Sequence, residues 1–147
     1  MNAPVTCVAV VTGGAAGIGR ACVERLLRDG LGVLFTDSAS DDAAATCRDL
    51  GHAQDRLQFV PGDVRDASHL QAAVERALAA WGRLDVLIAN AGVQTGGTLL
   101  DTSDEDWQRV LDVNLSGVRH ACRAASIQTS HYGKRTNGRR HHQKVDG

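Results

Sequence analysis

The sequence predicts an α/β fold with a doubly wound parallel sheet. Three observations lead to this prediction. Short apolar runs alternate with segments of helical periodicity, glycines gather directly after the first apolar run, and the apolar runs end in polar or small residues. Strands that alternate with helices form parallel sheets joined by right-handed crossovers, so the alternation favours this architecture over bundles and sandwiches.

The first half of the chain supplies two strands and two helices. An unbroken apolar run over 5–11 is typical of a strand covered on both faces, and helical spacing follows over 17–28. A second strand is predicted over 31–36, where Asp37 ends it. The alanine-rich stretch from 40 to about 50 predicts a second helix, because the aspartates in its first turn interact favourably with the helix dipole.

The second half continues the alternation. A short strand is predicted over 57–60, then a helix that runs from a capping Ser68 to residue 81, then a strand over 84–89. The stretch 90–102 is expected to be a loop, and Ser103 a strong N-cap for the last helix. We expect that helix to carry on one face Trp107, Val110, Leu111, Asn114, Val118 and Cys122.

Composition narrows the class of protein. The chain has 147 residues, of which 43% are hydrophobic, enough for one domain with a core. Its four cysteines form no CxxC pair, and Cys7 and Cys22 stand at apolar positions of a strand and a helix, so we expect buried free thiols in a reducing compartment. Neither a secretory leader nor an apolar run of membrane-spanning length is recognisable. We therefore expect a soluble cytoplasmic protein with no membrane partner.

The stretch 12–19, TGGAAGIG, joins the first strand to the first helix. Unpaired backbone N–H groups and the positive end of the helix dipole meet at a helix N-terminus, and glycines let a diphosphate approach without meeting a Cβ. The turn therefore predicts a site for the diphosphate of a dinucleotide. A glycine-rich turn without a ligand is the alternative interpretation.

Polar residues stand at the ends of the four predicted strands: Thr12, Asp37, Asp63 and Asn90. Ligands of open α/β sheets bind outside the carboxyl ends of the strands, so we expect one site there. The alternative is that strand ends simply favour turn-forming residues. The carboxylate of Asp37 can accept hydrogen bonds from a ribose diol and repels a 2′-phosphate, so NAD is favoured over NADP.

Five motifs resemble the short-chain dehydrogenase/reductase family in residue type, order and spacing. They are TGGAAGIG at 12–19, Asp37, GDV at 62–64, NAG at 90–92 and VNLSG at 113–117. The resemblance covers about residues 5–125 and implies a Rossmann-like fold that is incomplete at the C-terminal side. It also implies an NAD-dependent oxidoreductase that transfers hydride between the nicotinamide and a secondary alcohol or ketone, with a homo-oligomer as the intact form.

The same resemblance implies roles for individual residues. The positions that correspond to the cofactor site are Gly13, Gly17, Ile18, Gly19, Asp37, Asp63, Val64, Asn90, Ala91 and Gly92. Asn114 corresponds to the catalytic asparagine, which supports a proton relay by holding a water in line with a lysine. From the residues alone, Asn114 lies on an apolar stripe, where an unpaired amide would cost about 1–3 kcal/mol. It therefore either has a buried partner or serves a site.

The chain departs from the family where the catalytic Ser and the Tyr-x-x-x-Lys pair are expected. Tyr132 is its only tyrosine, and Thr136 stands where that pair requires a lysine. Loss of a positioned acid–base group typically costs about 10²–10⁴ in rate, so we expect impaired catalysis. A non-catalytic NAD-binding fragment is the alternative function.

The sequence pattern changes near residue 126. Both lysines lie beyond it, alanine and apolar periodicity disappear, and 16 of the 17 acidic residues precede it. We interpret 1–126 as a partial dinucleotide-binding domain and 127–147 as a basic, disordered tail produced by a shifted or truncated reading frame. The acidic body argues against nucleic acid as a partner, although the basic tail leaves such an association as an alternative. The adjacent histidines of the tail lack further ligands, so no metal site is predicted.

Overall fold

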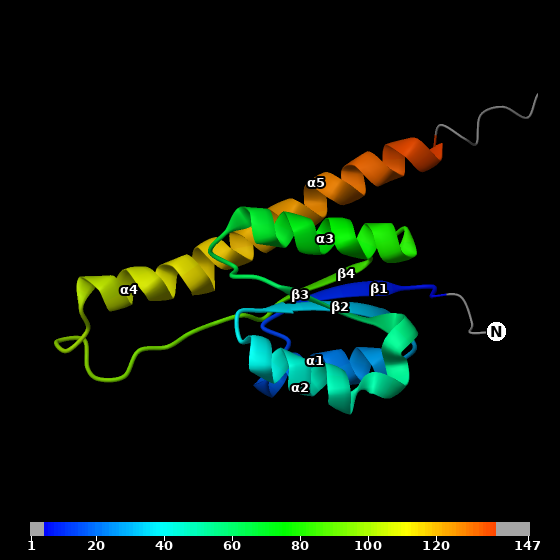
Figure 1. Cartoon of the computed structure of the whole chain (residues 1–147). Helices are drawn as coiled ribbons and strands as arrows, with labels where there is room; N and C mark the ends of the chain where they lie inside the picture. The colour runs from blue at the N-terminus through cyan, green and yellow to red at the C-terminus, as the bar shows by residue number, and fades with distance from the viewer. Residues whose placement is uncertain (1–4, 138–147) are drawn as a thin grey trace, which may run out of the picture.

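The computed structural model describes residues 5–137, which form a four-stranded parallel sheet with the strand order β3-β2-β1-β4. Helices α1 and α2 cover one face of this sheet, and α3 and α5 lie on the other (Figure 1). The predicted doubly wound α/β fold is confirmed. The elements in chain order are β1 (Val8–Thr12), α1 (Gly17–Arg28), β2 (Gly32–Asp37), α2 (Ser40–Asp49), the 3₁₀-helix η1 (Gly51–Arg56), β3 (Leu57–Pro61), α3 (Ala67–Trp81), β4 (Val86–Ala89), α4 (Asp104–Leu111), the π-helical turn η2 (Asp112–Ser116) and α5 (Gly117–Asn137).

The two central strands, β1 and β2, form the buried middle of the molecule. All five residues of β1 and five of the six in β2 are buried. Side chains from α1 and α2 pack on one face of these strands, and side chains from α3 pack on the other. Cover on both faces explains why β1 is continuously apolar instead of alternating. Strands β3 and β4 are mostly half-buried, because each lies at an edge of the described sheet.

The element boundaries differ from prediction by a few residues. Helix α1 has the predicted bounds, whereas β1 begins at Val8 instead of residue 5, because pairing with β2 starts at Gly32. Helix α3 is capped by Asp66 and not by Ser68: the Asp66 carboxylate accepts a hydrogen bond from the Ser68 N–H at 2.8 Å. Ser103 caps α4 as predicted.

Helix α4, the π-helical turn η2 and α5 follow one another as a continuous helical arm. Figure 1 shows α4 extending beyond the sheet, and none of its residues is buried. The predicted apolar face is therefore wrong: Trp107 is 55% exposed and Cys122 is exposed. The buried side of the arm starts only at η2 and consists of Val113, Gly117, Ala121 and Ala124. The π turn adds a residue to one helical turn, so the face cannot be extrapolated across it at a period of 3.6.

The backbone of α5 remains helical to Asn137, although we expected irregular structure from residue 127. Extending an existing helix adds one hydrogen bond for each residue that is fixed, whereas starting a helix is costly. The arm can therefore continue through a segment with no apolar periodicity of its own. The domain boundary at 126 stays a prediction, and residues 138–147 lie outside the described part of the chain.

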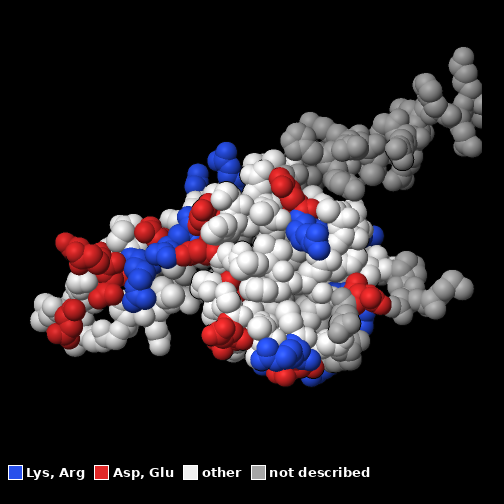
Figure 2. Space-filling model, in the orientation of Figure 1, with Lys and Arg blue, Asp and Glu red and all other residues white. Residues whose placement is uncertain are grey.

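No helix among residues 5–137 is both long enough and apolar enough to span a membrane. The four cysteines are free thiols, three of them half-buried and Cys122 exposed, so the expected full burial of Cys7 and Cys22 is wrong. On the face drawn in Figure 2, acidic and basic side chains are interspersed, with acidic residues concentrated at the start of α4. That face offers no continuous basic surface.

Candidate functional site

A pocket of about 450 Å³ opens at the carboxyl ends of the strands. Its wall combines the turn after β1, the end of β2, the loop after β3, the loop after β4 and one side of the helical arm. Eight of the ten predicted cofactor residues line it: Gly13, Gly17, Asp37, Asp63, Val64, Asn90, Ala91 and Gly92. The structure thus brings together segments as far apart in the sequence as Gly13 and Val113, at the edge where α/β sheets bind ligands.

The glycine turn after β1 depends on two close approaches. Gly13 has φ +65°, and a Cβ there would lie 2.8 Å from the Ala91 Cα. A Cβ on Gly19 would lie at an impossible distance from the Gly13 carbonyl oxygen. Gly19 therefore lets α1 meet the turn from behind and does not line the pocket, and Ile18 also lies outside the pocket wall, with 77% of its surface exposed.

Asp37 is held rigidly at the rim of the pocket. One carboxylate oxygen accepts a hydrogen bond from the Ala15 N–H and the other from the Ala39 N–H, each at 3.0 Å. These bonds join the end of β2 to the glycine turn and fix the direction of the carboxylate. The pocket wall next to it is formed by Ala16 and Ser38 and carries no cation.

Thr36 provides an internal test of whether the pocket suits a polar ligand. Its side chain is 1% exposed and lines the pocket, yet its hydroxyl oxygen has no hydrogen-bond partner. A buried hydroxyl without a partner is unfavourable, so this atom suits a bound polar group or a bridging water. The lining residue Gly17, where a Cβ would meet nothing within 4 Å, leaves the wall of the glycine turn open, so the pocket fits a polar ligand with a diphosphate.

Asn90 links the turn after β1 to the end of β4. Its side-chain amide donates to the carbonyl oxygens of Thr12 and Gly13 at 3.2 and 3.1 Å. In return, the Thr12 hydroxyl oxygen accepts hydrogen bonds from the backbone N–H groups of Asn90 and Ala91, each at 3.1 Å. This reciprocal set of bonds fixes the two loops against each other, so Asn90 shapes the wall and does not merely end a strand.

Two arginines that the sequence reasoning missed line the pocket, Arg65 in the loop after β3 and Arg109 on α4. Arg65 pairs with Asp63 through its guanidinium, which holds the pKa of the Asp63 carboxyl below its ordinary value. Arg109 reaches the pocket from α4 and also pairs with Asp106. Arg65 directly follows the GDV motif, so its place at the pocket could have been predicted from the sequence. Nothing in the helical pattern singles out Arg109.

Asn114 lies on η2, beside the pocket but outside its lining residues. Its amide oxygen accepts a hydrogen bond from the Val93 N–H at 2.8 Å, and its amide nitrogen donates to the Val93 carbonyl at 2.9 Å. The predicted apolar stripe does not bury Asn114, which is exposed, but its amide is paired. The bond ties the helical arm to the NAG loop, whose Gly92 lies against the same side chain.

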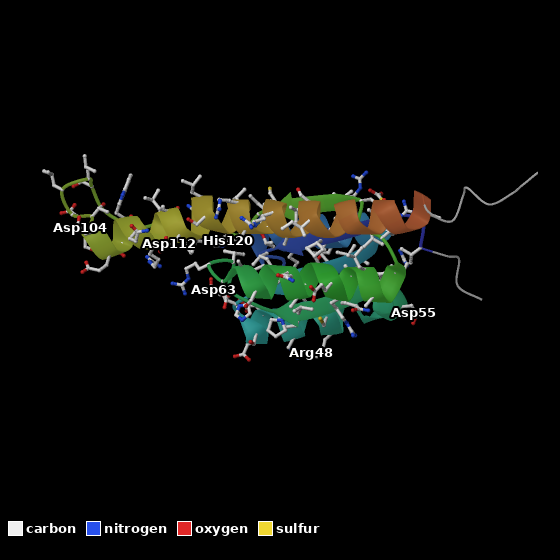
Figure 3. The ribbon with its side chains drawn as sticks, turned by 90° about the horizontal axis from the view of Figure 1, so that it is seen from above. Arg48, Asp55, Asp63, Asp104, Asp112 and His120 are labelled. Atoms are coloured by element: carbon white, nitrogen blue, oxygen red, sulfur yellow. The ribbon has the colours of Figure 1, made fainter. Side chains whose placement is uncertain are left out.

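Among residues 5–137, no group of three or more His, Cys, Asp or Glu is arranged to hold a metal ion. The two adjacent histidines of the tail, His141 and His142, lie outside the described residues. Figure 3 shows Asp63 near the start of α3, with Asp112 and His120 on the helical arm beside it.

Comparisons with known proteins point the same way. A sequence profile described as short chain dehydrogenase matches residues 7–139. A 3-alpha-(or 20-beta)-hydroxysteroid dehydrogenase of Mycobacterium tuberculosis is 39% identical over 117 residues, which cover 80% of this chain and 44% of the relative. A cis-4-hydroxycyclohexanecarboxylate dehydrogenase of Sinomonas cyclohexanicum is 42% identical over 130 residues, covering 84% of this chain and 51% of the relative.

Solved structures give the same result. A short chain dehydrogenase/reductase from Burkholderia phymatum, in complex with NAD, matches with a TM-score of 0.79 and 35% identity over 86% of this chain and 45% of that one. A glucose/ribitol dehydrogenase of the same kind from Brucella melitensis matches with a TM-score of 0.80 and 29% identity, over 84% of this chain and 52% of that one. The chain thus spans about half the length of the relatives it matches, in agreement with the predicted incomplete sheet.

Proposed function

The chain belongs to the short-chain dehydrogenase family, and from that premise we propose that it binds NAD for hydride transfer between the nicotinamide and a secondary alcohol or ketone. The observation that carries the proposal is the continuous pocket wall formed by the glycine turn, Asp37, the GDV loop and the NAG loop. When bound, the nicotinamide would accept hydride from an alcohol or donate it to a ketone.

We assign the diphosphate to the glycine turn. Gly13 and Gly17 leave the approach open, and the N–H groups at the start of α1 would donate to the phosphate oxygens. Ile18 and Gly19 serve the same turn, Ile18 by flanking its entrance and Gly19 by letting α1 approach. Asp63 and Val64 would hold the adenine, and the NAG loop at 90–92 would flank the nicotinamide half.

Asp37 supports NAD over NADP. Its carboxylate lines the pocket with its direction fixed by two backbone N–H groups, and the lining residues beside it, Ala16 and Ser38, carry no positive charge. A ribose diol can donate hydrogen bonds to this carboxylate, whereas the charge of a 2′-phosphate would be repelled by it. The NAD complex of the Burkholderia structure is consistent with this preference.

The named relatives support a ring-bearing alcohol as the substrate class. One is described as a hydroxysteroid dehydrogenase and another as a hydroxycyclohexanecarboxylate dehydrogenase. We propose a secondary alcohol or its ketone for this chain, acting in the cytoplasm, where free thiols like its four cysteines persist. A homo-oligomer is proposed for the intact family form.

A second candidate function is NAD binding without turnover. Tyr132 is followed at the fourth position by Thr136 and not by a lysine, which favours this alternative. In this alternative, Asn114 would still hold the NAG loop through its two hydrogen bonds to Val93. It would support a proton relay only if a tyrosine and a lysine supplied the other groups of that relay. Binding and turnover must therefore be measured separately.

Calorimetric titration with NAD and NADP tests the proposal. The folded chain should bind NAD more tightly than NADP, and Asp37→Asn should weaken NAD binding by about tenfold or more while narrowing that preference, because it removes a charged acceptor. Asp41→Asn, an exposed aspartate on α2, is the matched control and should leave both affinities unchanged. Turnover of secondary alcohols with NAD would support the dehydrogenase, binding alone would support the second candidate, and a folded chain that binds neither nucleotide would refute both.

A further inference from the structure

Two histidines hold the loop at 62–66, which forms one side of the proposed nucleotide pocket. His69 on α3 contacts the Asp63 N–H at 3.0 Å, and His120 on α5 contacts the Val64 carbonyl at 3.1 Å. We propose that His69 and His120 are positioning residues for this loop, and that protonation of His69 releases the loop and weakens dinucleotide binding at acid pH. The inference rests on the proposed function, which it deepens by adding control through pH.

The contact of His69 requires a neutral imidazole. A backbone N–H can only donate, so the His69 Nδ1 atom must accept from Asp63 and its proton must sit on Nε2. Once both ring nitrogens carry protons, Nδ1 becomes a donor and faces another donor. The bond is then lost, and the Asp63 N–H is left without this partner.

The contact of His120 has the opposite requirement. The Val64 carbonyl oxygen can only accept, so the His120 Nδ1 atom must donate to it. An imidazole with a proton on Nδ1 and a fully protonated imidazolium both make this bond. Acidification therefore preserves the His120 contact and breaks the His69 contact, so the two histidines differ in their response although they hold neighbouring residues.

A protonated His69 would face several charged groups at this corner. The groups facing this corner from the loop, η2 and α5 are Asp63, Arg65, Asp66, Asp112 and His120. The Asp66 carboxylate lies 3.9 Å from the His69 Nε2 atom and can attract a protonated ring away from Asp63. Hydrogen bonds from Arg65 and Ser68 hold the pKa values of Asp63 and Asp66, respectively, below their ordinary values, so both carboxylates stay charged in mildly acidic solution.

Loss of the His69 bond would act directly on the pocket wall. Gly62, Asp63, Val64 and Arg65 all line the pocket, and a Cβ on Gly62 would lie 3.0 Å from the His69 Cβ. His69 thus lies close to Gly62, and its imidazole holds the loop through the hydrogen bond from the Asp63 N–H. A rearranged loop would change the shape offered to the adenine half while leaving the glycine turn and Asp37 intact.

NAD binding to the full chain, measured by calorimetry between about pH 5 and pH 8, tests the inference. Wild-type affinity should fall by about two- to tenfold on acidification, the usual net value of one hydrogen bond. His69→Asn places an amide oxygen where Nδ1 stood, so it keeps an acceptor that does not titrate, and its affinity should stay nearly constant over this range. His120→Asn should keep the wild-type pH profile, whatever its effect on affinity at neutral pH.

A second readout separates this inference from the proposed function. Nitrogen chemical shifts of the ligand-free chain should show His69 protonated on Nε2 and His120 on Nδ1 at neutral pH. A His69→Asn profile as steep as the wild type, or a His69 proton on Nδ1, would overturn the inference while leaving NAD binding standing. A folded chain that binds no NAD at any pH would overturn the proposed function and the acid response together. The positions of the ring protons would still show whether His69 accepts from Asp63 and His120 donates to Val64.

Discussion

The centre of the sheet and the helical arm differ in how much of their apolar surface is covered by other elements of this chain. Every residue of β1 is buried between helices on both faces, and the glycine turn that follows is fixed by β2 and β4. In the arm, α4 has no buried residue, and Trp107 and Leu115 are 55% and 65% exposed. The comparison teaches that apolar pattern predicts burial only where the covering elements are present.

The tightest point of the central region gives the largest expected effect. Gly19→Ala would drive a Cβ into the Gly13 carbonyl oxygen, backbone against backbone, and should lower the free energy of unfolding by about 3 kcal/mol or more. An alanine in a helix otherwise stabilises by about 1 kcal/mol relative to glycine, so the sign itself is diagnostic. Denaturant unfolding measures the effect.

Gly96→Ala is the matched control for this substitution. Gly96 lies in the loop before α4, and a Cβ there meets nothing within 4 Å. Its unfolding free energy should stay within about 0.5 kcal/mol of wild type. If Gly19→Ala and Gly96→Ala changed the unfolding free energy equally, the close packing at Gly19 would not distinguish the central region from the loop before α4.

Thr12→Val tests the bond between the first and the last described strand. It removes the hydroxyl that accepts from the N–H groups of Asn90 and Ala91, so the expected loss is about 1–3 kcal/mol for each amide left without an acceptor. Thr12→Ser keeps the hydroxyl and loses only a methyl group, at about 0.8 kcal/mol. Thermal unfolding of both variants checks that the Val variant is the less stable. A Ser variant as unstable as the Val variant would contradict the role of the hydroxyl.

The same contrast explains what sequence reasoning could predict. The bounds of α1 and the alternation of strands and helices follow from local signals, namely apolar runs and glycines. The residues that end strands likewise indicated Asp37, Asp63 and Asn90, which line the pocket. Arg109 and the π turn at Asp112–Ser116 could not be predicted, because each depends on where the arm crosses the sheet. The cap of α3 was misassigned since Asp66 and Ser68 are both good capping residues.

Asp85 gives a smaller effect that depends on pH. Its carboxylate accepts from the Val8 N–H at the start of β1, and hydrogen bonds from Arg83 hold its pKa below the ordinary value. Its stabilising contribution is therefore fully present above the unfolded-state pKa, near 4, and is lost as the pH falls through the lower folded-state pKa. Asp85→Asn should cost about 1 kcal/mol at neutral pH and flatten the decline of stability below about pH 4.

Unfolding free energies measured across that acid range check this prediction. Asp104→Asn is the control, because Asp104 is exposed in the first turn of α4, on the arm. It should leave the slope against pH unchanged. If both variants flattened the decline of unfolding free energy with falling pH equally, the decline would come from the overall charge and not from the hydrogen bond at the start of β1.

The smallest effect on stability is expected on the arm itself. Trp107→Gln combined with Leu115→Gln removes two exposed apolar side chains, so the free energy of unfolding should change by no more than about 0.5 kcal/mol. Exposed apolar surface favours association, so the wild type should self-associate at high concentration and the double variant should do so less. Light scattering measures the association, and denaturant unfolding measures the stability. A wild type that stays monomeric, or a double variant that unfolds easily, would mean that these side chains already have cover and that the arm resembles the centre of the sheet.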